Sequence, residues 1–192
     1  MRMLGIATLA ALAGLGAGCG GEAGGALTHV SMPDAGQRFP NLTLLGVRSA
    51  ATLDTPAEVS MDEFYDPSGA QYDLLHVTGI FMWCPHCNNE TNNLATISAW
   101  QTDHRVAVVQ IATLGYGNAS PSWDELKRWV GDHNLNFPVL VDGQGAQLGQ
   151  YFPVDSVPLN IVVNPRTMGT LAVDVGEVGD CQAYEQGFLE RL

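Results

Sequence analysis

The stretch that decides the fold of this chain is Trp83-Cys84-Pro85-His86-Cys87. It follows an apolar run over residues 74–82, which predicts a buried strand, and precedes residues 88–100, which we expect to form a helix. The cysteines would then lie at a strand end and a helix N-terminus, where unpaired N–H groups and the helix dipole stabilise a thiolate. Pro85 suits the first helical turn because its missing N–H costs nothing there.

The spacing of the two cysteines predicts redox chemistry. Cys84 can attack a disulfide, and Cys87, one helical turn away, can resolve the resulting mixed disulfide. A lone pair of this kind also occurs as half of a zinc site or as two buried thiols. Zinc needs two further ligands at ordered spacing, and the sequence has no second C-x-x-C and no H-x-x-x-H. Redox activity is therefore the better interpretation, with no metal site and no cofactor expected.

The composition describes a globular protein of one domain. The chain has 192 residues, of which 46% are hydrophobic and 15% charged. Its net charge of -12 argues against nucleic acid as a partner, because phosphate binding needs a basic surface.

The N-terminus is typical of a secretory signal peptide, here residues 1–18, with a short positive start, an apolar stretch and small residues. Because Cys19 follows, the segment resembles a bacterial lipoprotein signal, which implies lipidation of Cys19 and a membrane anchor. Cleavage after the small residues alone is the alternative, and a Cys19–Cys181 bridge would then be possible. Residues 19–38 are rich in Gly and predict a flexible tether, so residues 39–192 form the domain. Either route predicts an extracytoplasmic, periplasmic-side location.

Strands and helices alternate along the domain. This order predicts an α/β fold with a mixed central sheet flanked by helices. The expected strands are residues 39–45, 74–82, 105–113, 137–141, 159–163 and 170–175, and the expected helices are residues 61–65, 88–100, 122–133, 147–152 and 181–192.

The C-P-H-C motif in this order of elements resembles the thioredoxin superfamily, and within it the extracytoplasmic TlpA/ResA-like, redoxin-type proteins. Trp83 precedes the first cysteine, and Glu90 follows the second by three residues, as in that group. Val157-Pro158, directly before an expected strand, matches the position of the family's cis-proline. The resemblance implies a thioredoxin-like fold and a thiol–disulfide oxidoreductase. It also implies that Trp83, Pro85, Val157 and Pro158 lie at the substrate site, with the Val157 backbone pairing with the substrate like an added strand. An ordinary strand-start proline is the alternative.

Two further residues are candidates for tuning the cysteines. Thioredoxins have a buried Asp six positions before the first cysteine, and this chain has Thr78 there, so Glu90 is the better candidate for a proton acceptor near Cys87. A solvated helix charge is the alternative for Glu90. A cationic His86 would stabilise the Cys84 thiolate and make the disulfide more oxidising.

The expected function is disulfide exchange with cysteine pairs of exported proteins, with a membrane redox partner. C-P-H-C is also the motif of DsbA-like oxidases, so oxidase and reductase directions both stay open. A thioredoxin-fold copper or metal chaperone is the alternative function, because two thiolates suit soft metals.

Overall fold

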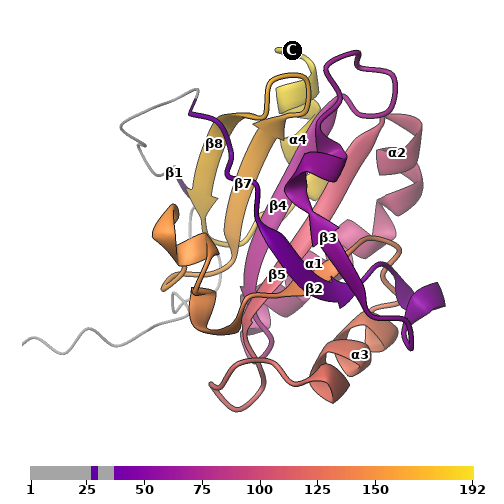
Figure 1. Cartoon of the computed structure of the whole chain (residues 1–192). Coiled ribbons are helices and arrows are strands. Elements are labelled where there is room, and N and C mark those ends of the chain that lie inside the picture. Colours follow the sequence, from indigo (N-terminus) through magenta and orange to yellow (C-terminus); the bar gives the residue numbers. More distant parts are fainter. Residues whose placement is uncertain (1–26, 30–36) are drawn as a thin grey trace, which may run out of the picture.

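The computed structural model describes residues 27–29 and 37–192, whose strands form one mixed sheet (Figure 1). The predicted signal peptide and Cys19 lie outside the described residues. The eight strands lie in the order β1-β8-β7-β4-β5-β6-β2-β3. Their bounds are β1 Thr28–His29, β2 Thr43–Val47, β3 Ala57–Ser60, β4 Leu74–Phe81, β5 Val106–Leu114, β6 Val139–Val141, β7 Leu159–Asn164 and β8 Gly169–Val175.

Helices connect or follow these strands. The α-helices are α1 Pro85–Thr96, α2 Ser98–Asp103, α3 Trp123–Asp132 and α4 Cys181–Leu189, and short 3₁₀ helices cover Ala50–Thr52, Met61–Phe64, Gly143–Gly145 and Leu148–Gln150. A capping box starts α3, since the side chains of Ser122 and Glu125 each accept a hydrogen bond from the backbone N–H of the other.

Strand β4 is central and decides where the cysteines lie. All eight of its residues are buried, which is why it is a continuous apolar run rather than an alternating one. It pairs in parallel with β5 on one side and antiparallel with β7 on the other. Because α1 follows β4 in the crossover to the parallel strand β5, the residues directly after β4 lie beyond the carboxyl end of this strand and at the start of α1.

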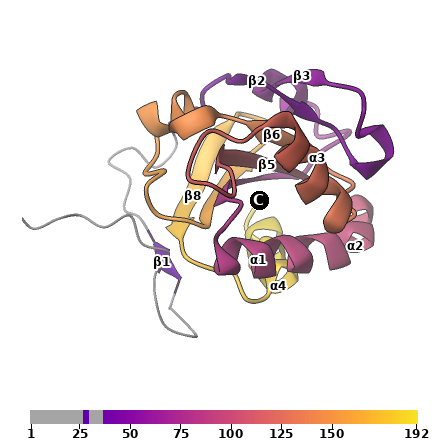
Figure 2. The ribbon, with the colours of Figure 1, turned by 90° about the horizontal axis from the view of Figure 1, so that it is seen from below.

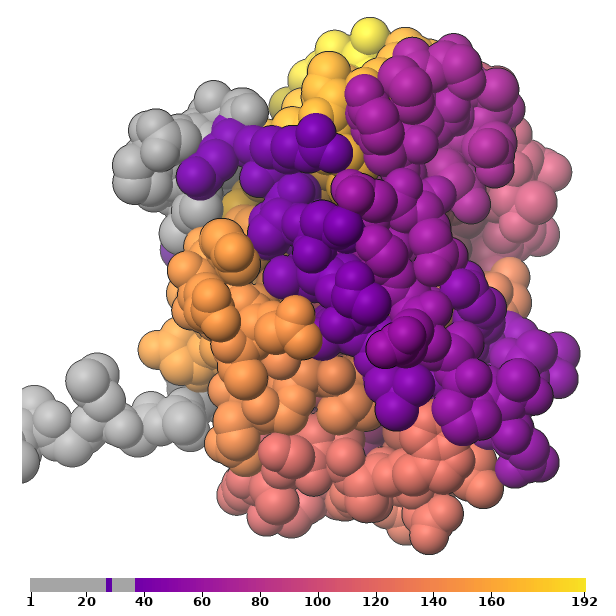
Figure 3. Space-filling model, in the orientation of Figure 1, coloured from indigo at the N-terminus to yellow at the C-terminus, as the bar shows by residue number. Residues whose placement is uncertain are grey.

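The sheet is covered on both faces by apolar clusters. The α-helices pack on one face, where Leu94 of α1, Trp129 of α3 and Cys181 of α4 belong to the same cluster (Figure 2). The other face is closed by loop segments instead of α-helices, and there the rings of Phe39 and Phe152 stack with centroids 5.4 Å apart. The indigo and orange segments that carry these two rings lie side by side in Figure 3.

Most predicted elements are present, and three differ. The helix expected over residues 88–100 is two helices that meet at Ile97, whose φ of -95° and ψ of 8° are not helical. The tether expected over residues 19–38 is interrupted by Thr28–His29, which pairs with β8, and the first core strand begins at Thr43 instead of residue 39. Strand β3, which the sequence analysis missed, pairs with β2. Within the described residues, no helix is both long and apolar enough to cross a membrane.

Candidate active site

The two cysteines lie at the junction of β4 and α1. Cys84 is the N-cap residue of α1, in extended conformation, and Pro85 is the first helical residue, as predicted. The Cys84 N–H donates to the Phe81 carbonyl at 3.0 Å, and its own carbonyl accepts from the Asn88 N–H at 3.1 Å. The side chain therefore lies beside the free N–H groups of the first helical turn, which favour a negative charge on its sulfur.

The environment distinguishes the two thiols. Both are reduced, and both side chains are buried. Burial raises the pKa of Cys87 well above its ordinary value, and a hydrogen bond from its thiol to the Cys84 sulfur raises it further. Cys87 thus keeps its proton while Cys84 is the sulfur that receives a hydrogen bond. The Cys84 residue is 1% exposed.

Val157 and Pro158 lie beside this junction. Gly79 of β4 faces Leu159 of β7 in an antiparallel pair, so the residues before Leu159 run next to the end of β4 that leads to Cys84. Val157 belongs to the same apolar cluster as Cys84 and Cys87. The Val157–Pro158 bond is cis, which confirms the cis-proline prediction.

His86 is paired with a carboxylate that the sequence analysis did not identify. Its Nδ1 lies 2.6 Å from Oε2 of Glu177, in the loop between β8 and α4, and both side chains are about one quarter exposed. The carboxylate of Glu177 compensates the positive charge that a protonated His86 imidazole carries. Any stabilisation of the Cys84 thiolate by His86 is therefore smaller than an isolated imidazolium would provide.

Glu90 is not a solvated helix charge. It is 1% exposed, one turn after Cys87 on the same helix. Its Oε2 accepts from the Val178 N–H at 2.7 Å and from Asn160 Nδ2 at 3.3 Å, whereas its Oε1 has no partner. Burial raises the pKa of Glu90 to about 7, although the Val178 bond, the charge of His76 and the Asn160 bond act against the increase. A carboxyl group near neutrality is suited to exchange a proton.

A second set of polar side chains supports the other side of α1. Thr91 donates to the Cys87 carbonyl at 2.7 Å and accepts from Gln110 of β5 at 2.9 Å. Gln110 also accepts from the Trp129 indole at 2.7 Å and donates to Thr78 at 3.3 Å. Thr78, at the position of the thioredoxin Asp, is thus a structural hydrogen-bonding residue in this chain.

The remaining candidates have defined places. Trp83 is half-buried against the ring of Phe81, with centroids 5.5 Å apart, and its indole N–H is buried without a partner. Pro85 is exposed. Cys181 is a free, buried thiol at the start of α4, and the possible partner Cys19 lies outside the described residues. Burial raises the pKa of Cys181 far above its ordinary range, which makes it unreactive.

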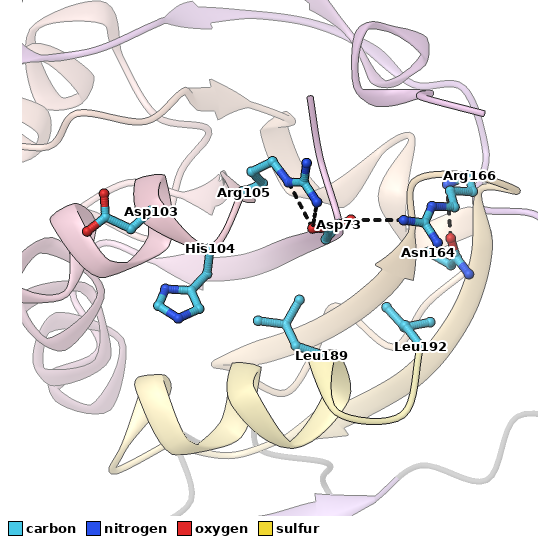
Figure 4. A pocket seen from close by; sticks show the side chains of 8 residues that line it. All are labelled: Asp73, Asp103, His104, Arg105, Asn164, Arg166, Leu189 and Leu192. Carbon is cyan, nitrogen blue, oxygen red and sulfur yellow. Dashed lines mark hydrogen bonds and ion pairs between the residues drawn. The ribbon is translucent and has the colours of Figure 1, made fainter. Parts of the chain in front are cut away.

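A cavity of about 610 Å³ lies away from the cysteines (Figure 4). Asp73 lies at its centre and accepts from Arg105 at 2.9 Å and from Arg166 at 3.0 Å. Because Asp73 directly precedes β4 and Cys84 follows it, an eight-residue strand, about 26 Å long, separates the cavity from the thiols. Elsewhere too, no group of three or more His, Cys, Asp or Glu in the described part of the chain could hold a metal ion.

No protein-family model and no curated protein sequence matches the chain. Solved structures do match it. A DsbF homologue from Corynebacterium diphtheriae has a TM-score of 0.60 and 24% identity, over 92% of this chain and 100% of that chain. The fold is thioredoxin-like. The thioredoxin domain of a thiol-disulfide oxidoreductase from Bacteroides vulgatus has a TM-score of 0.60 and 17% identity, over 82% and 99%. StoA from Bacillus subtilis has a TM-score of 0.53 and 14% identity, over 77% and 99%.

Proposed function

We propose that this thioredoxin-like protein is a thiol–disulfide oxidoreductase that exchanges disulfides through Cys84 and Cys87. The observation that carries the proposal is the placement of Cys84 at the N-cap of α1, beside the free N–H groups of the helix, with buried Cys87, whose pKa is raised, in the first turn of the same helix. It leaves one sulfur ready to carry negative charge and one that is protonated, which are the states required of an attacking and a resolving cysteine.

The cycle follows from these states. The Cys84 thiolate attacks a substrate disulfide, forming a mixed disulfide and releasing one substrate thiolate, which takes a proton from water. Cys87 then loses its proton and attacks the Cys84 sulfur. The Cys84–Cys87 bond forms, the second substrate sulfur leaves as a thiolate and is protonated, and the substrate is reduced by two electrons. The reverse sequence oxidises a substrate dithiol.

Glu90 is the proposed acceptor of the Cys87 proton. The two residues are one turn apart on α1, and their charges interact directly, because ionised Glu90 raises the pKa of Cys87. A thiol whose pKa is raised by burial needs a base, and a carboxyl group with a pKa of about 7 is ionised often enough to act as one.

The end of β7 is the proposed substrate site. Val157 and Trp83 flank the cysteines, and a substrate segment would lie along the Val157 backbone like an added strand. The proposed substrates are cysteine pairs of exported proteins, with electrons exchanged through a membrane redox partner. The domain would be anchored by lipidated Cys19 on the periplasmic side. Intact-mass analysis of membrane fractions tests the anchor, which is refuted by a mature form that begins elsewhere.

The purified protein should exchange with a chromogenic disulfide such as 5,5′-dithiobis(2-nitrobenzoate). Two thiol equivalents are expected, the first from attack by Cys84 and the second from resolution by Cys87. Cys84→Ser should abolish both, and Cys87→Ser should stop at a stable mixed disulfide. Cys181→Ala is the matched control and should keep both phases. Normal exchange by Cys84→Ser would refute the proposal.

A further inference from the structure

A continuous chain of buried polar side chains extends from Glu90 to the far side of the helical layer. Asn160 of β7 donates to Glu90 and accepts from His76 of β4, whose Nε2 lies 2.9 Å from Asn160 Oδ1. Nδ1 of His76 lies 2.8 Å from Oε1 of Glu185 on α4. Gln101 of α2 donates to both oxygens of Glu185, at 3.0 and 3.1 Å. The five side chains are each less than 5% exposed and come from five different elements.

The hydrogen bonds define where the protons lie. Asn160 Nδ2 donates to Glu90 and also to the Gly176 carbonyl, so its oxygen faces His76 and His76 Nε2 carries a proton. Both oxygens of Glu185 accept hydrogen bonds from Gln101, and one of them also lies next to His76. Burial acts against a charged His76, but the hydrogen bond and charge of Glu185 outweigh it, and the pKa of His76 is raised.

Stability does not account for this arrangement. Taking two charges out of water costs several kcal/mol per ion, and apolar residues of similar volume often stabilise a core equally well. A buried ion pair that contacts the proposed proton acceptor through one amide therefore indicates a role in the chemistry.

We propose that the His76–Glu185 pair is a positioning element for Glu90, holding a cationic imidazolium behind it and so setting the pH range in which Glu90 accepts the proton of Cys87. The inference rests on the proposed function. In the resolving step the proton moves from Cys87 Sγ to Glu90, the Cys84–Cys87 bond forms, and the bond from Cys84 to the substrate sulfur breaks. The departing thiolate is then protonated, and Glu90 returns its proton to that thiolate or to water.

Among the described residues, His76 is the cation whose charge favours ionisation of Glu90, whereas His86, four residues before Glu90 on the same helix, is paired with Glu177. The other titratable groups around Glu90 are Cys87 on its own helix, Cys181 and Tyr184 on α4, and Glu177 in the preceding loop. Burial raises the pKa of Cys181 and Tyr184, so both are neutral, whereas the negative charge of Glu177 acts against ionisation of Glu90. Loss of the His76 imidazolium would therefore remove a charge that favours the ionised carboxylate of Glu90.

Glu185→Gln is the test variant, because the amide can accept from Gln101 and donate to a neutral His76. In the wild type, the rate of the second thiol-release phase should rise with pH through a midpoint near pH 7. In Glu185→Gln, we expect this midpoint to lie about one pH unit higher. The second phase would then be roughly tenfold slower well below the midpoint, while the first phase is unchanged. Carbon-13 NMR of the Glu90 carboxyl in the reduced protein should show the same upward shift.

Two further variants keep the result interpretable. His76→Gln removes the cation itself and should shift the midpoint in the same direction, so it decides the matter if Glu185→Gln does not fold. Tyr184→Phe is the control, because it removes a 2.7 Å hydrogen bond to Asp174 from the same helix without changing a charge near Glu90. Its midpoint should not move. An unchanged midpoint in the folded test variants overturns the inference, whereas absence of the second phase in the wild type overturns the proposed function.

Discussion

Replacing Glu90 by glutamine removes the proposed proton acceptor with little change of shape. The amide oxygen can take the place of Oε2, which accepts from Val178 and Asn160, and the amide nitrogen can take the place of Oε1, which has no partner. The hydrogen bonds of Glu90 are therefore retained, and only the ability to accept a proton is lost.

The size of the effect follows from the two thiol environments. General-base catalysis contributes about 10²-fold or more, so the second thiol-release phase should slow about 100-fold at pH 7. In the wild type this phase should rise with pH through the Glu90 midpoint at about 7. In Glu90→Gln the step in rate with a midpoint at about pH 7 should disappear. The rate of the second phase should instead rise tenfold per pH unit, because it then depends on direct ionisation of Cys87, whose pKa is raised.

Stopped-flow absorbance from pH 5 to 9 measures both phases, and the first serves as an internal reference because Cys84 attacks without Glu90. Glu58→Gln is the matched control, since Glu58 is exposed on β3, the last strand of the sheet and four positions from β4 in the strand order, and it should match the wild type. A folded Glu90→Gln protein whose second phase stays within about twofold of the wild type at pH 7 would refute the role of Glu90 as base.

Three further outcomes are expected. The unfolding free energy of the reduced protein should fall by about 3 kcal/mol as pH rises from 4.5 to above 7, because folded Glu90 binds its proton more tightly than the unfolded carboxyl. The raised pKa of His76 acts in the same direction. Denaturant titrations should show that the unfolding free energy of Glu90→Gln depends less steeply on pH, and an equally steep dependence would contradict this. The Cys84–Cys87 couple should be more oxidising than that of thioredoxin. His86→Ala should lower its reduction potential by about 20 mV, equivalent to about 1 kcal/mol, as measured by glutathione equilibration and mass spectrometry. An unchanged potential would show that Glu177 cancels the charge of the imidazolium. Gly46→Ala should destabilise the protein by about 3 kcal/mol, because a Cβ at this position would overlap the Val139 carbonyl where β2 pairs with β6. An unchanged midpoint of thermal unfolding would argue against this close approach of the two strands.

Local signals determined much of this protein. The apolar run before Cys84 specified the buried strand, Ser122 and Glu125 specified the start of α3, and Val157-Pro158 predicted a cis bond that the structure contains. Each of these features depends on residues close together in the chain, so a pattern of period or spacing is enough to reveal it. Cys84 and Cys87 were identified in the same way, because one helical turn joins them.

Tertiary structure alone decided which side chains surround the candidate site residues. Glu177 reaches His86 across 91 residues, and Glu185 reaches His76 across 109. Nothing in the sequence connected His76 with Glu185, and the sequence could not distinguish a solvated Glu90 from a buried one. The available signals were weak: Asn160 interrupts an apolar strand, and Glu185 follows buried Cys181 by four residues on α4. Which polar groups share a buried space depends on how distant elements pack, and that packing sets the pKa of a carboxyl through burial and neighbouring charge.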